Sequence, residues 1–525
     1  MRPVILLLCL LQAVQSSVLQ TRLQAMLTEL AALAEVALNQ SVALQIGWYG
    51  STDHFTVAAG TVDVHGSQRN VTTEDTFLYG SGTKPFTAAA LMRLIDQGKI
   101  KASDRAHIHI DPYLRANNGT ELKELFGPEV HNATVLDLIR MSAGIPDFEA
   151  GSRDAYILQE GSRVWPVYDN IRYAAAYQEE YGGTCKAAED CDCGQLPPLA
   201  KAFCEPRQEK CMKVGQYLGC LGRPNGFPLP GGWVCWNKMR VGFCPTRVKS
   251  SPLVCAPGAC SFYSSASYEL AGLLIAAVGV PDGKYTDMDL GNFTLPSRDD
   301  YPTLTFPPVT RTTHSEVASM KLSDHLSVPG HAALFGGSGT VVFDQNPTVL
   351  GWTCGHMIGA AGDVAKFFFD LFSPKSARRI VSNASLAEMT RTAPLSMGWG
   401  THIEYGAGIM AVPVSNNASY WPENTSQWGF FLGHGGMTYG FSSNQGYISL
   451  ADAGFSVTSN TDIPSLSNLA VCKVMEIAAE VLSGQELMLN CSHTGSAMEA
   501  GFAFSKSTAR WEHIEDSSDS VSVFV

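Results

Sequence analysis

The chain has 525 residues, of which 45% are hydrophobic and 16% are charged. This balance is typical of a globular protein and excludes intrinsic disorder as the state of most of the chain. The formal net charge of −13 argues against a nucleic-acid-binding protein, because such proteins present a basic surface.

The first residues have the pattern of a secretory signal peptide. Arg2 precedes the apolar run Val4–Leu11, and Val14 and Ser16 suit the −3 and −1 positions of a cleavage site. The apolar run is too short to span a membrane. We therefore expect removal of residues 1–16 and a secreted protein, extracellular or lumenal, with no membrane span.

A helix and two strands are predicted next. Residues 19–38 place leucines and alanines at helical spacing, which indicates an amphipathic helix packed on a sheet. A membrane-surface helix is the weaker alternative, because only Arg22 is basic. Residues 42–49 and 55–64 alternate in polarity like two antiparallel strands joined by a polar turn.

A Ser-x-x-Lys tetrapeptide, formed by Ser81 and Lys84, follows a predicted strand at 76–80. An apolar-periodic run at 85–94 comes after it, and Pro85 suits the first turn of a helix. In a helix that begins near Ser81, the two side chains would share one face. A serine needs a neighbouring base to become a nucleophile. The tetrapeptide can therefore supply both groups.

The tetrapeptide by itself is a weak signal. This spacing is expected by chance about once or twice in a chain of this length, and Ser81 is the one serine here followed by lysine at that distance.

The sequence contains no Gly-x-Ser-x-Gly elbow, no phosphate-binding Gly-x-x-x-x-Gly-Lys loop and no His-Glu-x-x-His zinc motif. His107 and His109 alternate on a predicted strand or loop near Asp111, where metal binding is a weak alternative.

Further motifs occur downstream in a fixed order. Tyr263-Ser264-Ser265 precedes an apolar run, and His434-Gly435-Gly436-Met437 follows later in the chain. With Ser81 and Lys84, they resemble the three signatures of the serine β-lactamase and penicillin-binding-protein superfamily, and its class C-like branch in particular. The resemblance covers about residues 30–485. It extends to three connecting segments: TVLDLIRMSAGIPDF at 134–148, GAAGDVAKFFFDL at 359–371 and YGAG at 405–408.

The resemblance implies a fold. In that family both chain ends build one antiparallel sheet flanked by helices, and the middle of the chain forms a mostly helical lobe with the active site between. We expect this α/β fold of the α+β type. Predicted strands at 441–450 and 455–460 and a predicted helix at 465–482 agree with it. We expect a catalytic domain over 17–490 and a C-terminal tail over 491–525, which is Ser-rich and poorly ordered after Thr494.

The resemblance also implies catalytic roles. Ser81 would be the acylated nucleophile, with Lys84 as its proton acceptor or electrostatic partner. Tyr263 would relay protons to the leaving group and from water. The backbone N–H groups of Ser81 and Met437 match the oxyanion hole of the family.

Three residues would border the substrate. His434 and Gly436 would lie on the strand at the cleft edge, and the alternative for His434 is a hydrogen bond to Tyr263 or to a substrate carboxylate. Ser265 stands where the family typically has asparagine, so a short hydroxyl replaces a carboxamide. This departure weakens the expectation of β-lactam or peptidoglycan-like substrates and leaves small amides, peptides and esters.

We therefore expect a serine hydrolase that acts through an acyl-enzyme, with no cofactor, no metal and no nucleic-acid partner. The alternative is a catalytically inactive binding or structural glycoprotein on the same fold. Ser81, Lys84 and Tyr263 favour the enzyme, whereas Ser265 and a large insertion keep the alternative open.

The insertion spans residues 151–252 and is rich in cysteine, glycine and proline. Ten of the 14 cysteines lie between Cys185 and Cys260, which predicts a disulfide framework in a secreted chain. Zinc is disfavoured, because this stretch has no histidine and no Cys-x-x-Cys pair. We interpret the insertion as a disulfide-held surface elaboration, with a rim on the substrate cleft as the alternative.

The remaining cysteines and nine asparagines also fit a secreted protein. Loss of Cys9 with the signal peptide leaves an odd number of cysteines, and we expect Cys354 to be unpaired and Cys472 to bond to Cys491. Nine Asn-x-Ser/Thr sequons predict glycosylation, at Asn39, Asn70, Asn118, Asn132, Asn292, Asn383, Asn417, Asn424 and Asn490.

Overall fold

The computed structural model describes most of the chain outside the insertion. The described residues are 2–38, 41–64, 67–148, 167–176, 227–229, 232–237, 240–244, 253–306, 313–314, 344–345, 351–397, 403–414, 428–438, 440–461, 464–489, 491, 502–505 and 510–513. Most of the cysteines expected to crosslink the insertion, Cys185 to Cys220, lie outside the described residues.

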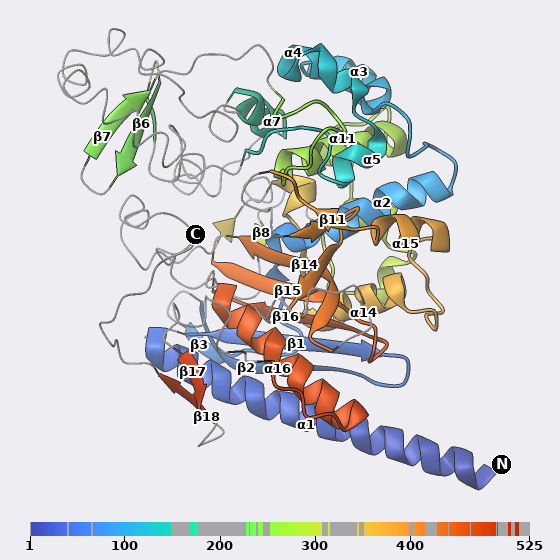
Figure 1. Cartoon of the computed structure of the whole chain (residues 1–525), viewed down its shortest axis with the longest axis vertical. Helices are drawn as coiled ribbons and strands as arrows, with labels where there is room; N and C mark the ends of the chain where they lie inside the picture. The colour runs from blue at the N-terminus through green and yellow to red at the C-terminus, as the bar shows by residue number, and fades with distance from the viewer. Residues whose placement is uncertain are drawn as a thin grey trace.

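A nine-stranded antiparallel sheet combines both ends of the chain (Figure 1). Its strands run in the order β11-β12-β13-β14-β15-β16-β1-β2-β3, so that the N-terminal strand β1 pairs with the C-terminal strand β16. The expected fold class is confirmed. The bounds of the strands are β1 Ala43–Gly50, β2 His54–Val64, β3 Ser67–Asn70, β11 Ala393–Pro394, β12 Glu404–Tyr405, β13 Met410–Pro413, β14 Phe430–Thr438, β15 Phe441–Ile448 and β16 Ala453–Ser459.

Helices cover both faces of the sheet. Successive side chains of a strand point to opposite faces, so the sheet packs against helices on both sides. On β1, the buried side chains of Leu44, Ile46 and Trp48 share a core with α1 (Arg2–Leu38) and α16 (Pro464–Ser483). On the opposite face, a Cβ on Gly47 would lie 2.1 Å from the carbonyl oxygen of the first residue of α14 (Ala361–Phe372). The close backbone contact explains the glycine.

The predicted N-terminal helix is present and begins earlier than expected. Helix α1 starts at Arg2 rather than near residue 19, and its side chains Leu19, Leu23 and Leu27 are buried in a core. Arg22 of α1 pairs with Glu480 of α16 at 2.7 Å, and the two helices run side by side in Figure 1. No helix in the described part of the chain is both long and apolar enough to cross a membrane.

A helical lobe lies beyond the sheet, in the upper part of Figure 1. Its longest helix among the described residues, α11, carries the apolar run that follows Tyr263-Ser264-Ser265. The helices are α2 Lys84–Asp96, α3 Ala106–Ala116, α4 Leu122–Phe126, α5 Val135–Ile139, α7 Val167–Ala176, α11 Ser265–Gly279, α12 Leu290–Thr294 and α15 Asn383–Met389. The 3-10 turns are η1 Gly80–Thr83, η2 Pro128–Asn132, η6 Tyr285–Asp287, η7 Arg298–Asp300 and η9 Trp352–Cys354.

Short strand pairs complete the described structure. β4 (Phe77–Leu78) pairs with β10 (Ile358–Gly359) just before η1. Within the insertion, three strands form a small sheet, and two further pairs lie outside it. Their bounds are β5 Phe227–Leu229, β6 Gly232–Asn237, β7 Arg240–Cys244, β8 Thr313–His314, β9 Asp344–Gln345, β17 Phe502–Ser505 and β18 Arg510–His513.

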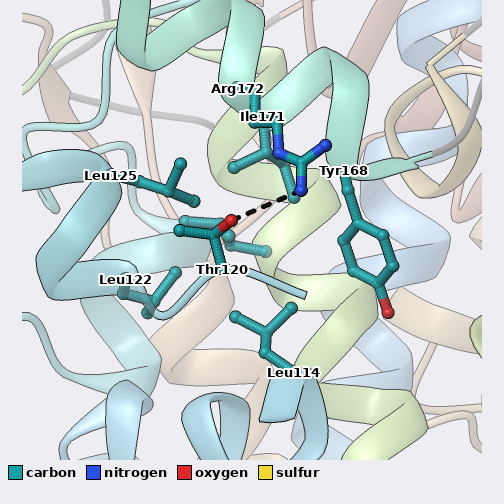
Figure 2. Close-up of a pocket in the computed structure, with 8 residues that line it drawn as sticks. Leu114, Thr120, Leu122, Leu125, Tyr168, Ile171 and Arg172 are labelled. Carbon is teal, nitrogen blue, oxygen red and sulfur yellow. Dashed lines mark hydrogen bonds between the residues drawn. The ribbon is translucent and has the colours of Figure 1, made fainter. Parts of the chain in front are cut away.

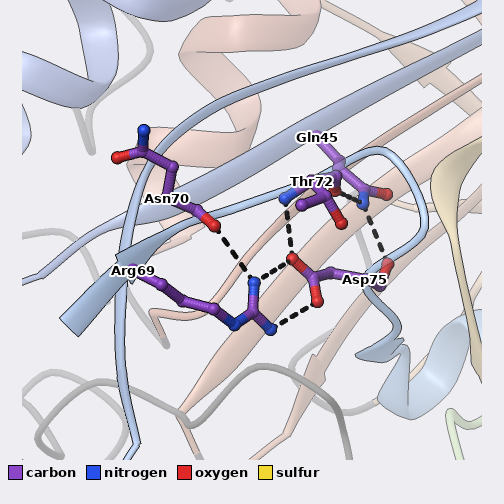
Figure 3. Close-up of polar contacts among 5 residues, drawn as sticks. All are labelled: Gln45, Arg69, Asn70, Thr72 and Asp75. Atoms are coloured by element: carbon purple, nitrogen blue, oxygen red, sulfur yellow. Dashed lines mark hydrogen bonds and ion pairs between the residues drawn. The ribbon is translucent and has the colours of Figure 1, made fainter. Parts of the chain in front are cut away.

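A polar cluster holds residues 70–75, the segment between β3 and β4 (Figure 3). Arg69 forms two hydrogen bonds to the carboxylate of Asp75, at 2.6 and 2.7 Å. Gln45, buried on β1, donates to the carbonyl oxygens of Thr72 and Asp75 at 2.6 and 2.9 Å. Its Oε1 accepts from the backbone N–H of Ala361 at 2.9 Å. The cluster therefore ties the segment between β3 and β4 to both β1 and α14.

Two disulfides are present in the described chain. The expected Cys472–Cys491 bond ties α16 to the residue after Asn490, and a second bond joins Cys255 to Cys260. Cys354 is buried and lies outside both.

Candidate active site

Ser81 lies on the turn η1, at the point where the chain enters α2. Gly80 has φ +50°, and a Cβ there would lie 2.2 Å from the carbonyl oxygen of Met437 on β14. Only glycine tolerates both the left-handed backbone and this contact. The tight turn places the Ser81 hydroxyl, which is partly exposed, beside strand β14.

Lys84 is fully buried and its ammonium group lies among oxygen atoms. Its Nζ is 2.8 Å from Ser81 Oγ, 3.1 Å from Ser265 Oγ and 3.4 Å from the carbonyl oxygen of Cys354. The same nitrogen lies 4.9 Å from the centre of the Tyr263 ring. The structure therefore brings together five residues from three distant parts of the sequence, and the motifs singled out all of them except Cys354.

The beginning of α11 positions Tyr263 and Ser265. Ser264 caps the helix, because its Oγ accepts from the backbone N–H of Ser267 at 3.1 Å. The backbone N–H of Ser265 donates to Oδ1 of the buried Asp147 at 3.0 Å. Tyr263 is buried, immediately before the cap. Asp147 belongs to the segment at 134–148 that resembles the family, but no motif singled it out.

Strand β14 forms the other side of the site. Its pairing with β13 ends at Gly433, and within the described chain residues from His434 onward have a strand partner only on the β15 side. A Cβ on Gly436 would lie 2.0 Å from the carbonyl oxygen of Tyr79 and 2.7 Å from the nitrogen of Gly82. This end of β14 therefore lies in backbone contact with η1.

His434 is fully buried, and it contacts a residue that the motifs did not predict. Its Nε2 lies 3.3 Å from the hydroxyl of Tyr405, the first residue of the YGAG segment, and its Nδ1 lies 2.5 Å from the carbonyl oxygen of Gly435. The Tyr263 and His434 rings lie 6.3 Å apart between centres. Burial and the positive charge of Lys84 lower the pKa of His434 to about 3, so the imidazole is neutral at neutral pH.

The hydrogen-bonding groups around His434 fix its tautomer. A carbonyl oxygen only accepts, so Nδ1 carries the proton and Nε2 offers a lone pair to Tyr405. The Tyr405 hydroxyl also lies 3.1 Å from the hydroxyl of Tyr268, which donates to the carbonyl oxygen of Ile139 at 2.7 Å. The Tyr405 hydroxyl, which has one proton, therefore has two acceptors within reach, the Tyr268 hydroxyl and His434 Nε2.

The histidines near Asp111 do not form the strand or loop that the sequence indicated. His107 and His109 lie on helix α3. Their rings take different partners, because His107 stacks on His131 with centres 3.9 Å apart and His109 contacts Asp104 at 3.4 Å. In the described chain, the one convergent group of three metal-ligand side chains contains Cys472 and Cys491, whose sulfurs are already bonded to each other.

These observations can be compared with known proteins. Residues 42–178 match the family model Beta-lactamase. This part of the chain is similar to the Beta-lactamase family. No curated protein sequence matches it.

Solved structures share the fold of this chain. A D-amino acid amidase from Ochrobactrum anthropi SV3, complexed with L-phenylalanine amide, has 16% identity and a TM-score of 0.55, with 89% of this chain and 100% of that chain covered. A D-stereospecific amidohydrolase from Streptomyces sp. has 18% identity and a TM-score of 0.52, with 87% and 99% covered.

Part of the expected insertion belongs to the helical lobe. Helix α7 lies within 151–252, yet Val167, Ile171 and Ala174 are buried in the main core. The buried Asn170 donates to Glu269 of α11 at 2.7 Å. The family model also extends through this helix, to residue 178.

A small pocket in the helical lobe is separate from Ser81. It lies among α3, α4, α7 and α11, and Arg172 donates to Thr120 at 3.3 Å across it (Figure 2). Its lining is mostly leucine, isoleucine and tyrosine: Leu114, Leu122, Leu125, Tyr168, Ile171 and Leu270. The pocket contains none of the motif residues.

Proposed function

We propose that this chain is a secreted serine hydrolase that acts through an acyl-enzyme on small amides, peptides or esters. The observation that carries the proposal is the 2.8 Å contact between Lys84 Nζ and Ser81 Oγ. Nucleophile and base within hydrogen-bond reach, with the base held by further groups, are the requirement for an activated serine. Ser265 and the carbonyl of Cys354 are those further groups.

The reaction follows from these positions. Lys84 acts as the base after its ammonium group has released one proton to solvent. Ser81 Oγ then attacks the substrate carbonyl carbon, and the hydroxyl proton passes to the neutral amine of Lys84. The negative charge on the carbonyl oxygen is stabilised by the N–H groups of Ser81 and Met437. Tyr263, whose ring lies beside Lys84, relays the proton to the leaving group. Water then cleaves the acyl-enzyme by the same groups in reverse order.

A fluorophosphonate probe tests this proposal, together with a panel of D- and L-amino acid amides and small esters. The amides are included because the two solved structures with this fold are a D-stereospecific amidohydrolase and a D-amino acid amidase. Wild type should be labelled on the peptide that contains Ser81, and Ser81→Ala should lose both labelling and turnover. Ser443→Ala, which changes a buried serine on β15, is the matched control. A folded wild type that is neither labelled nor active would favour the inactive glycoprotein instead.

The secreted state is supported by surface positions. All five sequon asparagines in the described chain are exposed: Asn70, Asn118, Asn132, Asn292 and Asn383. Cleavage after Ser16 would leave in place the buried residues of α1 from Leu19 to Ala34. Protein recovered from the medium of expressing cells should begin at Ser17 and should lose mass on deglycosylation. An intact Met1 or an unchanged mass would contradict secretion with glycosylation.

A further inference from the structure

Gln445 lies beneath the turn that carries Ser81. It is fully buried on β15, directly opposite His434 of β14. Its Nε2 donates to the carbonyl oxygen of His434 at 2.6 Å. A Cβ on Gly82 would lie 2.4 Å from the same nitrogen. One carboxamide therefore contacts both β14 and the residue that follows the proposed nucleophile.

The two backbone segments that Gln445 contacts carry the two N–H groups of the proposed oxyanion hole, those of Ser81 and Met437. Their separation sets how well both groups reach one oxygen atom. β13 supports β14 only as far as Gly433, and Gln445 holds the next carbonyl along the strand. The side chain thus supports β14 at the point where its neighbouring strand ends.

The hydrogen bonding of Gln445 does not favour a purely stabilising role. Its Oε1 is buried and has no hydrogen-bond partner in the described part of the chain. A buried acceptor without a partner is destabilising. By contrast, Gln45, the other buried glutamine of the sheet, uses both ends of its carboxamide in three hydrogen bonds.

We propose that Gln445 is a positioning residue that sets the spacing between η1 and β14 and so completes the oxyanion hole. This inference rests on the proposed function, because it assigns Gln445 a role only if Ser81 is acylated. Gln445 acts through the backbone of His434 and Gly82 and does not touch the substrate itself.

The test compares two buried glutamines. Gln445→Met keeps the side-chain length and removes the amide, so the second-order rate of Ser81 labelling by a fluorophosphonate should fall about 10- to 100-fold. Binding of a boronic acid, which forms a tetrahedral adduct with Ser81, should weaken by a similar factor. The control Gln45→Met should label at the wild-type rate and lose more melting temperature, because it breaks three hydrogen bonds.

A second variant, Gln445→Asn, keeps the amide but shortens its reach, and it should show the same loss of labelling. Wild-type labelling by either folded Gln445 variant would overturn the inference. Equal slowing by Gln45→Met would also overturn it, since the effect would then be general to the sheet. Failure of wild type itself to be labelled at Ser81 would instead remove the proposed function, and the role of Gln445 with it.

Discussion

The ammonium group of Lys84 lies 3.1 Å from the hydroxyl of Ser265, at the motif position where the resembling family typically has asparagine. Both side chains are fully buried. A serine hydroxyl is shorter than a carboxamide, but it still reaches the lysine because Ser265 is the first residue of α11. The substitution therefore keeps the contact to Lys84 that the proposed mechanism needs.

Ser265→Ala should slow acylation of Ser81 about tenfold or more, because Lys84 loses one of its three oxygen neighbours. The loss of one hydrogen bond should cost about 1 kcal/mol of stability. Ser264→Ala is the matched control, since it removes the helix cap at a similar cost of about 1 kcal/mol. Fluorophosphonate labelling rates and urea unfolding of both variants provide the measurement. Equal labelling by the two would remove Ser265 from the mechanism.

Tyr263→Phe should reduce turnover by about 10²–10⁴, the usual effect of removing a general acid or base. The ring and its packing against Lys84 remain, so the melting temperature should change little. Intact-mass measurement should show an acyl-enzyme that persists on Ser81. Tyr79→Phe also removes a buried hydroxyl, which contacts Ser456 at 3.0 Å, and should leave turnover near normal. Normal steady-state turnover by Tyr263→Phe would exclude the relay.

Acid should destabilise the fold through two buried histidines. Burial lowers the pKa of His356 to about 3, and burial with the Lys84 charge does the same for His434. An unfolded histidine has a pKa of about 6.5. The unfolded state therefore binds protons that the folded state does not, and the free energy of unfolding falls as the pH drops from 6.5 towards 3. Each histidine contributes roughly 1.4 kcal/mol per pH unit over this range.

His356→Leu isolates one of these contributions. Neither ring nitrogen of His356 has a hydrogen-bond partner in the described chain, so leucine removes a polar group without breaking a bond. Urea unfolding at pH 7 and pH 4.5 should show a smaller loss of stability for this variant than for wild type. The same pH dependence in both proteins would mean that His356 is protonated in the folded state.

Loss of the Cys472–Cys491 disulfide should destabilise the catalytic domain. The bond closes a loop with a sequence separation of 19, for which chain entropy predicts about 3 kcal/mol. The Cys255–Cys260 bond has a separation of 5, and its loss should cost about 2 kcal/mol. Double alanine variants of each pair, compared by urea unfolding, measure the difference. A larger loss from the shorter loop would contradict the entropic explanation.

Local patterns in the sequence were enough to predict much of the sheet and its helices. The strands at 42–49, 55–64, 441–450 and 455–460 and the helix at 465–482 lie within a few residues of β1, β2, β15, β16 and α16. These elements follow from alternation and helical periodicity, which are short-range properties. The proximity of Ser81 and Lys84 was also predictable, because three residues in a helical turn place two side chains together.

Other features depend on contacts between distant residues. Lys84 and Ser265 are 181 positions apart, and the burial of His434 against Tyr405 joins residues 29 positions apart on different strands. The short stretch around His107 and His109 alternates like a strand, but packing of Ile110 and Leu114 into the lobe core favours the helix α3. The packing of α7 on α11 and the contact of Gln445 with His434 likewise join residues of different elements. Periodicity shows which face of an element is buried, whereas only the packed chain decides which residue lies opposite it.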